Sequence, residues 1–185
     1  MSKKENILEG LFNILKKVNT LENHNQVTEI LLKQPQLPEF FISFINSSYY
    51  NFEENINKKE NILFIIGYKL LSAITLSLIL YILYKEKIKD SLKEAIKEGF
   101  RFSEAAKNEE MFLLGFISKI KNYLSQDDLK EILKRAHFSP SLIYTNNSNI
   151  IKMTYKLNKK DLENIEKYSQ ILMNLIEDYT KRLGV

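Results

Sequence analysis

The chain has 185 residues, which is enough for one domain with a sizeable hydrophobic core. Five Gly and three Pro argue against a turn-rich β fold, and the absence of Cys excludes disulfides, thiol catalysis and thiolate metal sites. The 27 Lys and Arg and the 23 Asp and Glu leave a formal charge of +4, but bases and acids alternate along the chain, which is typical of solvated helix faces rather than of a phosphate-binding stripe.

Apolar residues at helical spacing predict helices near 4–18, 25–34, 37–48, 58–66, 68–84, 86–107, 109–124, 127–136 and 159–182. Four helix starts carry a small polar residue followed three positions later by an acid: Ser2 with Glu5, Asn57 with Glu60, Ser125 with Asp128, and Asn158 with Asp161. We expect residues 138–157 to be irregular, with the stretch IIKMTYKL either strand-like or a helical turn. Because no linker and no repeat divides the chain, residues 1–185 are predicted to form a single compact all-α bundle.

The corner at Pro35 is predicted to end one helix, and Pro38 suits the first turn of the next. That second helix ends at Asn46 and Ser47, where a chain reversal is expected because Asn tolerates the left-handed conformation and both side chains can satisfy nearby backbone groups. The two tyrosines that follow should bury their rings, find partners for their hydroxyls and pin the loop NFEENIN onto the bundle. Gly67 is expected to allow a sharp bend or a close helix approach.

The apolar run from Leu70 to Tyr84 has fifteen uncharged residues, fewer than the roughly 18 that a membrane-spanning helix needs. Lys69 and Lys85 flank it, so we interpret the run as the central helix of a bundle. The first ten residues, MSKKENILEG, lack the apolar stretch of a secretion signal. A cytoplasmic location is therefore expected, without membrane association.

The segment QPQLPEFFISFINSSYY, residues 34–50, resembles the signature of the HDOD family, a helical output domain of bacterial signalling proteins that is related in fold to the HD phosphohydrolases. Gln34 stands where the family has Asp. An apolar helix leading to a glycine and a long hydrophobic helix matches NILFIIGYKLLSAITLSLIL, and MFLLGF resembles a third family motif. The residues at family positions, to which we assign structural roles, are Pro35, Leu37, Asn46, Ser47, Tyr50, Gly67, Phe112 and Gly115.

The stretch EGFRFSEAAK resembles the subgroup in which an HDOD domain follows an EAL domain, with Arg101, Phe102 and Glu104 at the equivalent places. The resemblance covers residues 4–136, and 137–185 would be a C-terminal helical extension. Met1 lies directly before the first helix, so no EAL domain is expected upstream.

The position at which HD phosphohydrolases carry their His-Asp pair is occupied here by Ser118 and Lys119, and a lysine would repel a metal ion. His24 is expected in solvent before a helix, and His137 at a helix end. The paired acids Glu109–Glu110 and Asp127–Asp128 are interpreted as first-turn charges. We therefore expect no enzyme, no metal and no cofactor.

The resemblance implies a non-enzymatic signal-transduction module that acts through protein contacts, with a signalling or regulatory protein of a cyclic-di-GMP or two-component pathway as its partner. Tyr49, Tyr50, Phe52 and Tyr68 are the candidate interface residues. Homodimerisation is left open. The alternatives are a degenerate HD-type phosphohydrolase and a regulatory domain that binds a nucleotide or nucleic acid through Lys152, Lys156, Lys159 and Lys160, although the single basic stretch gives nucleic acid little support.

Overall fold

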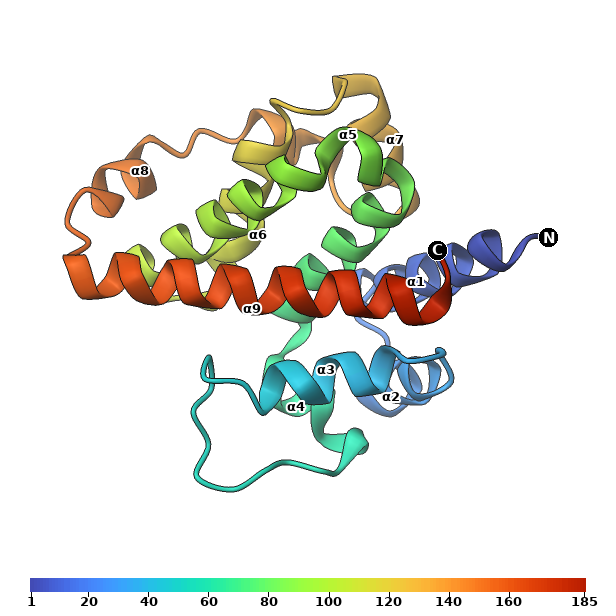
Figure 1. Cartoon of the computed structure of the whole chain (residues 1–185). Helices are drawn as coiled ribbons and strands as arrows, with labels where there is room; N and C mark the ends of the chain where they lie inside the picture. Colours follow the sequence, from blue (N-terminus) through green and yellow to red (C-terminus); the bar gives the residue numbers. More distant parts are fainter.

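The computed structural model describes all 185 residues as nine α-helices and three short 3₁₀ turns, with no strand (Figure 1). The helices are α1 (Lys3–Asn19), α2 (His24–Leu32), α3 (Leu37–Ile45), α4 (Ile62–Ile66), α5 (Tyr68–Ala106), α6 (Phe112–Ile120), α7 (Gln126–Arg135), α8 (Ser148–Thr154) and α9 (Lys159–Leu183). The 3₁₀ turns are η1 (Lys59–Asn61), η2 (Glu109–Met111) and η3 (Pro140–Tyr144). The predicted all-α class is confirmed.

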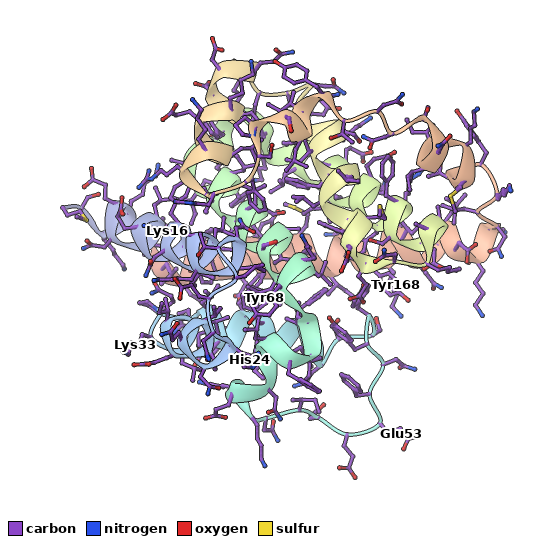
Figure 2. All side chains as sticks on the ribbon, turned by 180° about the vertical axis from the view of Figure 1, so that it is seen from behind. Lys16, His24, Lys33, Glu53, Tyr68 and Tyr168 are labelled. Carbon is purple, nitrogen blue, oxygen red and sulfur yellow. The ribbon has the colours of Figure 1, made fainter.

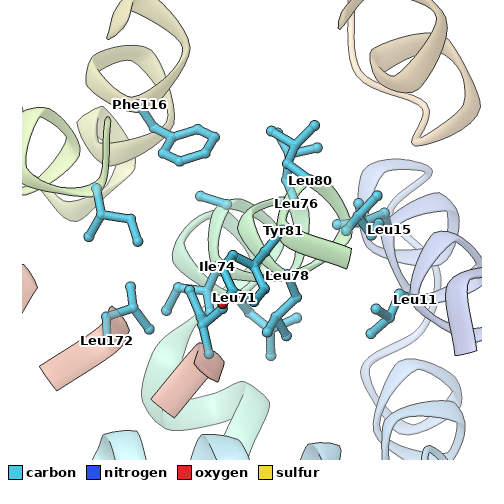
Figure 3. Packing of buried hydrophobic residues seen from close by; sticks show 14 of the residues in the cluster. Leu11, Leu15, Leu71, Ile74, Leu76, Leu78, Leu80, Tyr81, Phe116 and Leu172 are labelled. Carbon is cyan, nitrogen blue, oxygen red and sulfur yellow. The ribbon is translucent and has the colours of Figure 1, made fainter. Parts of the chain in front are cut away.

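Helix α5 lies at the centre of the molecule. Its first half carries apolar or small residues on every side, and it is therefore buried on every side. Figure 3 shows its leucines and isoleucines pointing toward Leu11 and Leu15 of α1 on one side, and toward Phe116 of α6 and Leu172 of α9 on the other. A single cluster of 48 buried side chains runs from Ile7 to Leu183. All the long helices therefore share one core.

The two helices predicted at 68–84 and 86–107 together form α5 and meet at a kink at Tyr84, whose φ of −127° and ψ of 20° depart from helical values, so the predicted boundary is confirmed. By length and composition α5 is the one helix that could cross a membrane, yet 72% of its most apolar window is buried inside the molecule. Such burial is typical of the core helix of a bundle.

Helix α9 lies across the whole molecule, with α5 and α6 on one side and α3 on the other (Figure 1). Its contact with α3 includes the rings of Phe40 and Tyr179, whose centroids are 5.6 Å apart. Both ends of the chain lie at the same side of the structure. The C-terminal helix thus joins the N-terminal third of the chain to the central helices.

Three of the four predicted helix starts are confirmed. Ser2 and Asn158 form reciprocal capping boxes with the acids three residues later, and the Ser125 hydroxyl accepts from the Asp128 amide at 3.1 Å. The prediction at Asn57 is wrong, because Lys58 precedes η1 there and makes no side-chain cap. The stretch 150–157 is not a strand, since its first half belongs to α8.

Two glycines have distinct structural roles. Gly67, with φ of 79° and ψ of 160°, makes the bend between α4 and α5, and no atom lies within 4 Å of the position its Cβ would take, so it serves a turn and not a close approach. Gly115 lets α6 approach α5, because a Cβ there would lie 2.8 Å from Cγ of Phe102 and would overlap the Glu98 carbonyl.

Candidate functional site: an aromatic pocket beside Glu109

The loop after α3 is held by the side chain of Asn46. Its amide nitrogen donates to the Ile56 carbonyl at 2.8 Å, and its amide oxygen accepts from the Ile56 N–H at 2.7 Å. Asn46 is not left-handed, because its φ is −82°, and Asn51 takes the left-handed conformation of this loop with φ of 53°. Ser47 donates to the Phe44 carbonyl at 2.6 Å, as expected of a residue that closes a helix end.

The fixed loop places Tyr49 at the centre of an aromatic cluster. Its ring stacks on Phe44 at 5.1 Å and lies 4.9 Å from Tyr50, 5.4 Å from Phe100 and 5.1 Å from Tyr168. Phe100 belongs to α5 and Tyr168 to α9, so three distant segments of the chain meet here. Edge-to-face and offset ring pairs of this kind stabilise a fixed geometry.

A polar segment closes the cluster on one side. Lys107 ends α5 in the left-handed conformation, with φ of 50°, and its ammonium group pairs with Glu104. Asn108 then caps η2 by accepting from the Glu110 amide at 2.9 Å. This turn brings the Glu109 carboxylate within 2.9 Å of the Tyr49 hydroxyl, which donates to it.

A hollow of about 310 Å³ that is open to solvent on one side, here called the aromatic pocket, is lined by Tyr49, Tyr50, Phe100, Ser103, Glu104, Lys107, Asn108, Glu109, Ile165 and Tyr168. Two lining hydroxyls, those of Tyr50 and Ser103, are buried and have no hydrogen-bond partner. Ser103 is only 9% exposed. Buried polar groups are nearly always paired, and these two hydroxyls are among five buried side-chain polar atoms without a partner, the others belonging to Thr28, Ser48 and Arg101.

Burial raises the pKa of Tyr49 far above its ordinary value, and the negative charge of Glu109 raises it further. The pKa of Tyr50 is raised by the same two causes, with burial again the larger. Both phenols therefore stay protonated at physiological pH. They can donate and accept hydrogen bonds, but they have no tendency to act as bases.

Three of the four predicted interface residues come together here. Tyr49 and Tyr50 are half-buried, and Phe52, 47% exposed, stacks on Tyr50 with ring centroids 5.6 Å apart and planes 2° from parallel. The expected partner for the Tyr50 hydroxyl is absent, which corrects that part of the prediction.

Tyr68, the fourth, lies elsewhere, at the start of α5 beside His24 (Figure 2). His24 is half-buried with its ring 6.4 Å from that of Tyr68, so the expectation that it stands in solvent is wrong. His137 is exposed and follows the end of α7.

Ser118 and Lys119, the residues predicted to stand at a degenerate HD position, lie on α6 and do not line the aromatic pocket. The Ser118 hydroxyl donates to the Gly115 carbonyl at 2.7 Å, and Lys119 borders a shallow depression with Asn146 and Asn147. No group of three or more His, Asp or Glu side chains is arranged to hold a metal ion.

No protein-family model, no curated protein and no solved structure matches the chain. The HDOD resemblance therefore stays a prediction.

Proposed function

We propose that this protein is a non-enzymatic cytoplasmic regulatory module that acts by binding a partner protein through the aromatic face formed by Phe52, Tyr50 and the mouth of the aromatic pocket. The observation that carries the proposal is Phe52, a large aromatic side chain that is 47% exposed on a loop fixed by Asn46. Aromatic anchors are enriched among the residues that dominate binding energy at interfaces.

The tether at Ile56 favours binding because it reduces the freedom that the loop would lose on contact with a partner. The paired hydrogen bonds of Asn46 hold Ile56, and the stacking on Tyr50 orients the Phe52 ring. Ordering a mobile side chain at an interface costs about 0.5–1.5 kcal/mol, and part of that cost is already met in the free protein. The HDOD resemblance adds the class of partner, a signalling or regulatory protein of a cyclic-di-GMP or two-component pathway.

Site-specific photo-crosslinking tests the proposal. A benzophenone amino acid replaces Phe52 in one variant and Tyr144, which is 59% exposed on η3, in a matched control. In lysate of the source organism the first variant is expected to form a discrete protein adduct that excess wild-type protein removes and excess Phe52→Ala protein does not. The proposal would be contradicted if position 52 formed no adduct that wild-type protein removes, or if positions 52 and 144 formed the same adducts.

A second candidate function is the binding of a nucleotide or nucleic acid by exposed lysines near the start of α9. No Asp or Glu occurs between Glu131 and Asp161, and Lys152, Lys156 and Lys160 are all exposed in or next to that interval. Lys159 is also exposed and has only a distant partner, Glu163, at 3.9 Å. A nucleotide or nucleic acid bound here should bind best at low salt, so a single-stranded oligonucleotide that fails to bind in low-salt buffer would remove this candidate.

A further inference from the structure

We propose that the aromatic pocket binds an organic cation, an ammonium or guanidinium group carried by a small molecule or by a Lys or Arg side chain of a partner. This goes beyond the protein contact proposed for Phe52 and does not depend on it. The inference follows from the charge, the orphan hydroxyls and the ring faces of one pocket.

The charge of the pocket favours a cation. Glu104 and Lys107 neutralise each other in an ion pair on the rim. Glu109 takes part in no ion pair, and the one hydrogen bond to its side chain comes from the neutral hydroxyl of Tyr49. Glu109 is exposed, so one negative charge without an ion-pair partner lies at the solvent-facing rim of the hollow.

The orphan hydroxyls can accept hydrogen bonds from such a ligand. Ser103 and Tyr50 each offer oxygen lone pairs, and neither hydroxyl has a partner within the protein. A ligand N–H would give these hydroxyls the hydrogen-bond partner that the protein does not supply. A ligand carboxylate or phosphate could also accept from these hydroxyls, but it would have to approach the carboxylate of Glu109, so the pair of hydroxyls and the acid together favour an N–H donor.

The aromatic lining points to the same class. The rings of Tyr49 and Tyr168 are half-buried with centroids 5.1 Å apart, and the buried ring of Phe100 supports both from behind. The face of an aromatic ring carries partial negative charge, so the two accessible rings favour a cation. Aromatic cages with an acid nearby are the recurrent solution for ammonium recognition. A hollow of about 310 Å³ is at the small end of ligand pockets, so it suits a head group or one side chain rather than a dinucleotide.

Matched charged and neutral ligands provide the test. Choline is compared with 3,3-dimethylbutan-1-ol, which replaces the quaternary nitrogen by carbon, and the blocked peptide Ac-Gly-Arg-Gly-NH₂ is compared with its citrulline analogue. Binding to the full chain is followed by amide NMR shifts at Ser103 and Glu109, which line the pocket. At least one cation should bind at millimolar concentration, roughly tenfold or more tightly than its neutral partner. Choline alone would indicate a small molecule, and the Arg peptide alone a partner side chain.

Two variants assign the binding to the pocket. Glu109→Gln keeps the hydrogen-bond acceptor for Tyr49 but removes the charge, and it should weaken cation binding about tenfold. Glu110→Gln removes a charge from the next residue, which does not line this pocket, and it should leave binding unchanged. Equal binding of charged and neutral ligands, equal loss in both variants, or no binding of any cation would overturn the inference. Photo-crosslinking at position 52 can succeed in all of these cases, so the two proposals fail separately.

Discussion

Substituting Gly115 by Ala should destabilise the protein although Ala is the better helix former. The new Cβ would lie 2.8 Å from Cγ of Phe102 and 2.9 Å from the carbonyl carbon of Glu98. Carbon atoms in contact stand about 3.5 Å or more apart, and the Glu98 carbonyl oxygen would lie closer still, so α6 would have to move by at least about 0.7 Å from α5.

The size of the effect follows from two opposing contributions. Overpacking costs about 1–3 kcal/mol, and the upper value applies here because one obstacle is backbone inside a helix and the other is the base of a fully buried ring. The higher helix propensity of Ala stabilises the folded state by about 1 kcal/mol relative to Gly. The net loss of unfolding free energy is therefore about 2 kcal/mol, which corresponds to a fall in Tm of roughly 4–8 °C for a chain of this size.

Urea unfolding followed by circular dichroism and tyrosine fluorescence measures this loss, with Gly10→Ala as the matched control. At Gly10, inside α1, the obstacle is only the end of the Gln34 side chain, which is held by one weak hydrogen bond of 3.5 Å to Ile30 and can move. The control should be neutral or up to about 1 kcal/mol more stable. If Gly115→Ala were as stable as the wild type, the close approach of α5 and α6 would not have the importance assigned to it.

Three further outcomes are expected. Asn46→Ala should cost about 1–3 kcal/mol and speed amide exchange in residues 51–58, whereas unchanged exchange would show that the loop is held by other contacts. Glu166 receives hydrogen bonds from Lys93 and Lys97 that hold its pKa below the ordinary value, so Glu166→Gln should lose at most about 1 kcal/mol at neutral pH, because the side chain is half exposed. The stabilisation that comes from this lowered pKa is fully present above about pH 4.3 and is lost as the pH falls through the folded-state pKa of Glu166. A difference in stability between the two proteins that persisted in acid, or in about 1 M salt, would contradict this assignment. Asn158→Ala should cost about 1 kcal/mol in urea titrations and increase fraying at the start of α9, and equal stability would mean that its capping box contributes nothing.

Local signals gave the correct secondary structure where one short stretch determines the outcome. The caps at Ser2, Ser125 and Asn158 each involve residues three apart, so spacing is sufficient to identify them. The signal at Asn57 has the same spacing, but the loop is tethered through Ile56 and the next turn begins one residue later. The boundary placed near residue 85 is the bend at Tyr84, where a run of charges follows the apolar half while packing continues along α6.

The sequence indicates only some of the residues that line the aromatic pocket. The sequence indicates that Tyr49, Tyr50 and Phe52 are candidates, because these aromatic residues follow an expected chain reversal at Asn46. Phe100 and Tyr168 have the helical spacing of ordinary core residues, and Glu109 has the position of an ordinary first-turn acid, so nothing in their own surroundings marks them. Their meeting in one pocket depends on the packing of α9 against α5, which no local pattern encodes.

The position of α9 has a consequence for biosynthesis. Because the chain is made from its N-terminus, α3 and α5 leave the ribosome well before the helix that covers them, and the rings of Phe40 and Phe100 must wait for Tyr179 and Tyr168. Until then a broad apolar surface stays in contact with solvent. The nascent protein is therefore most in need of chaperone protection in the interval between synthesis of α5 and completion of α9.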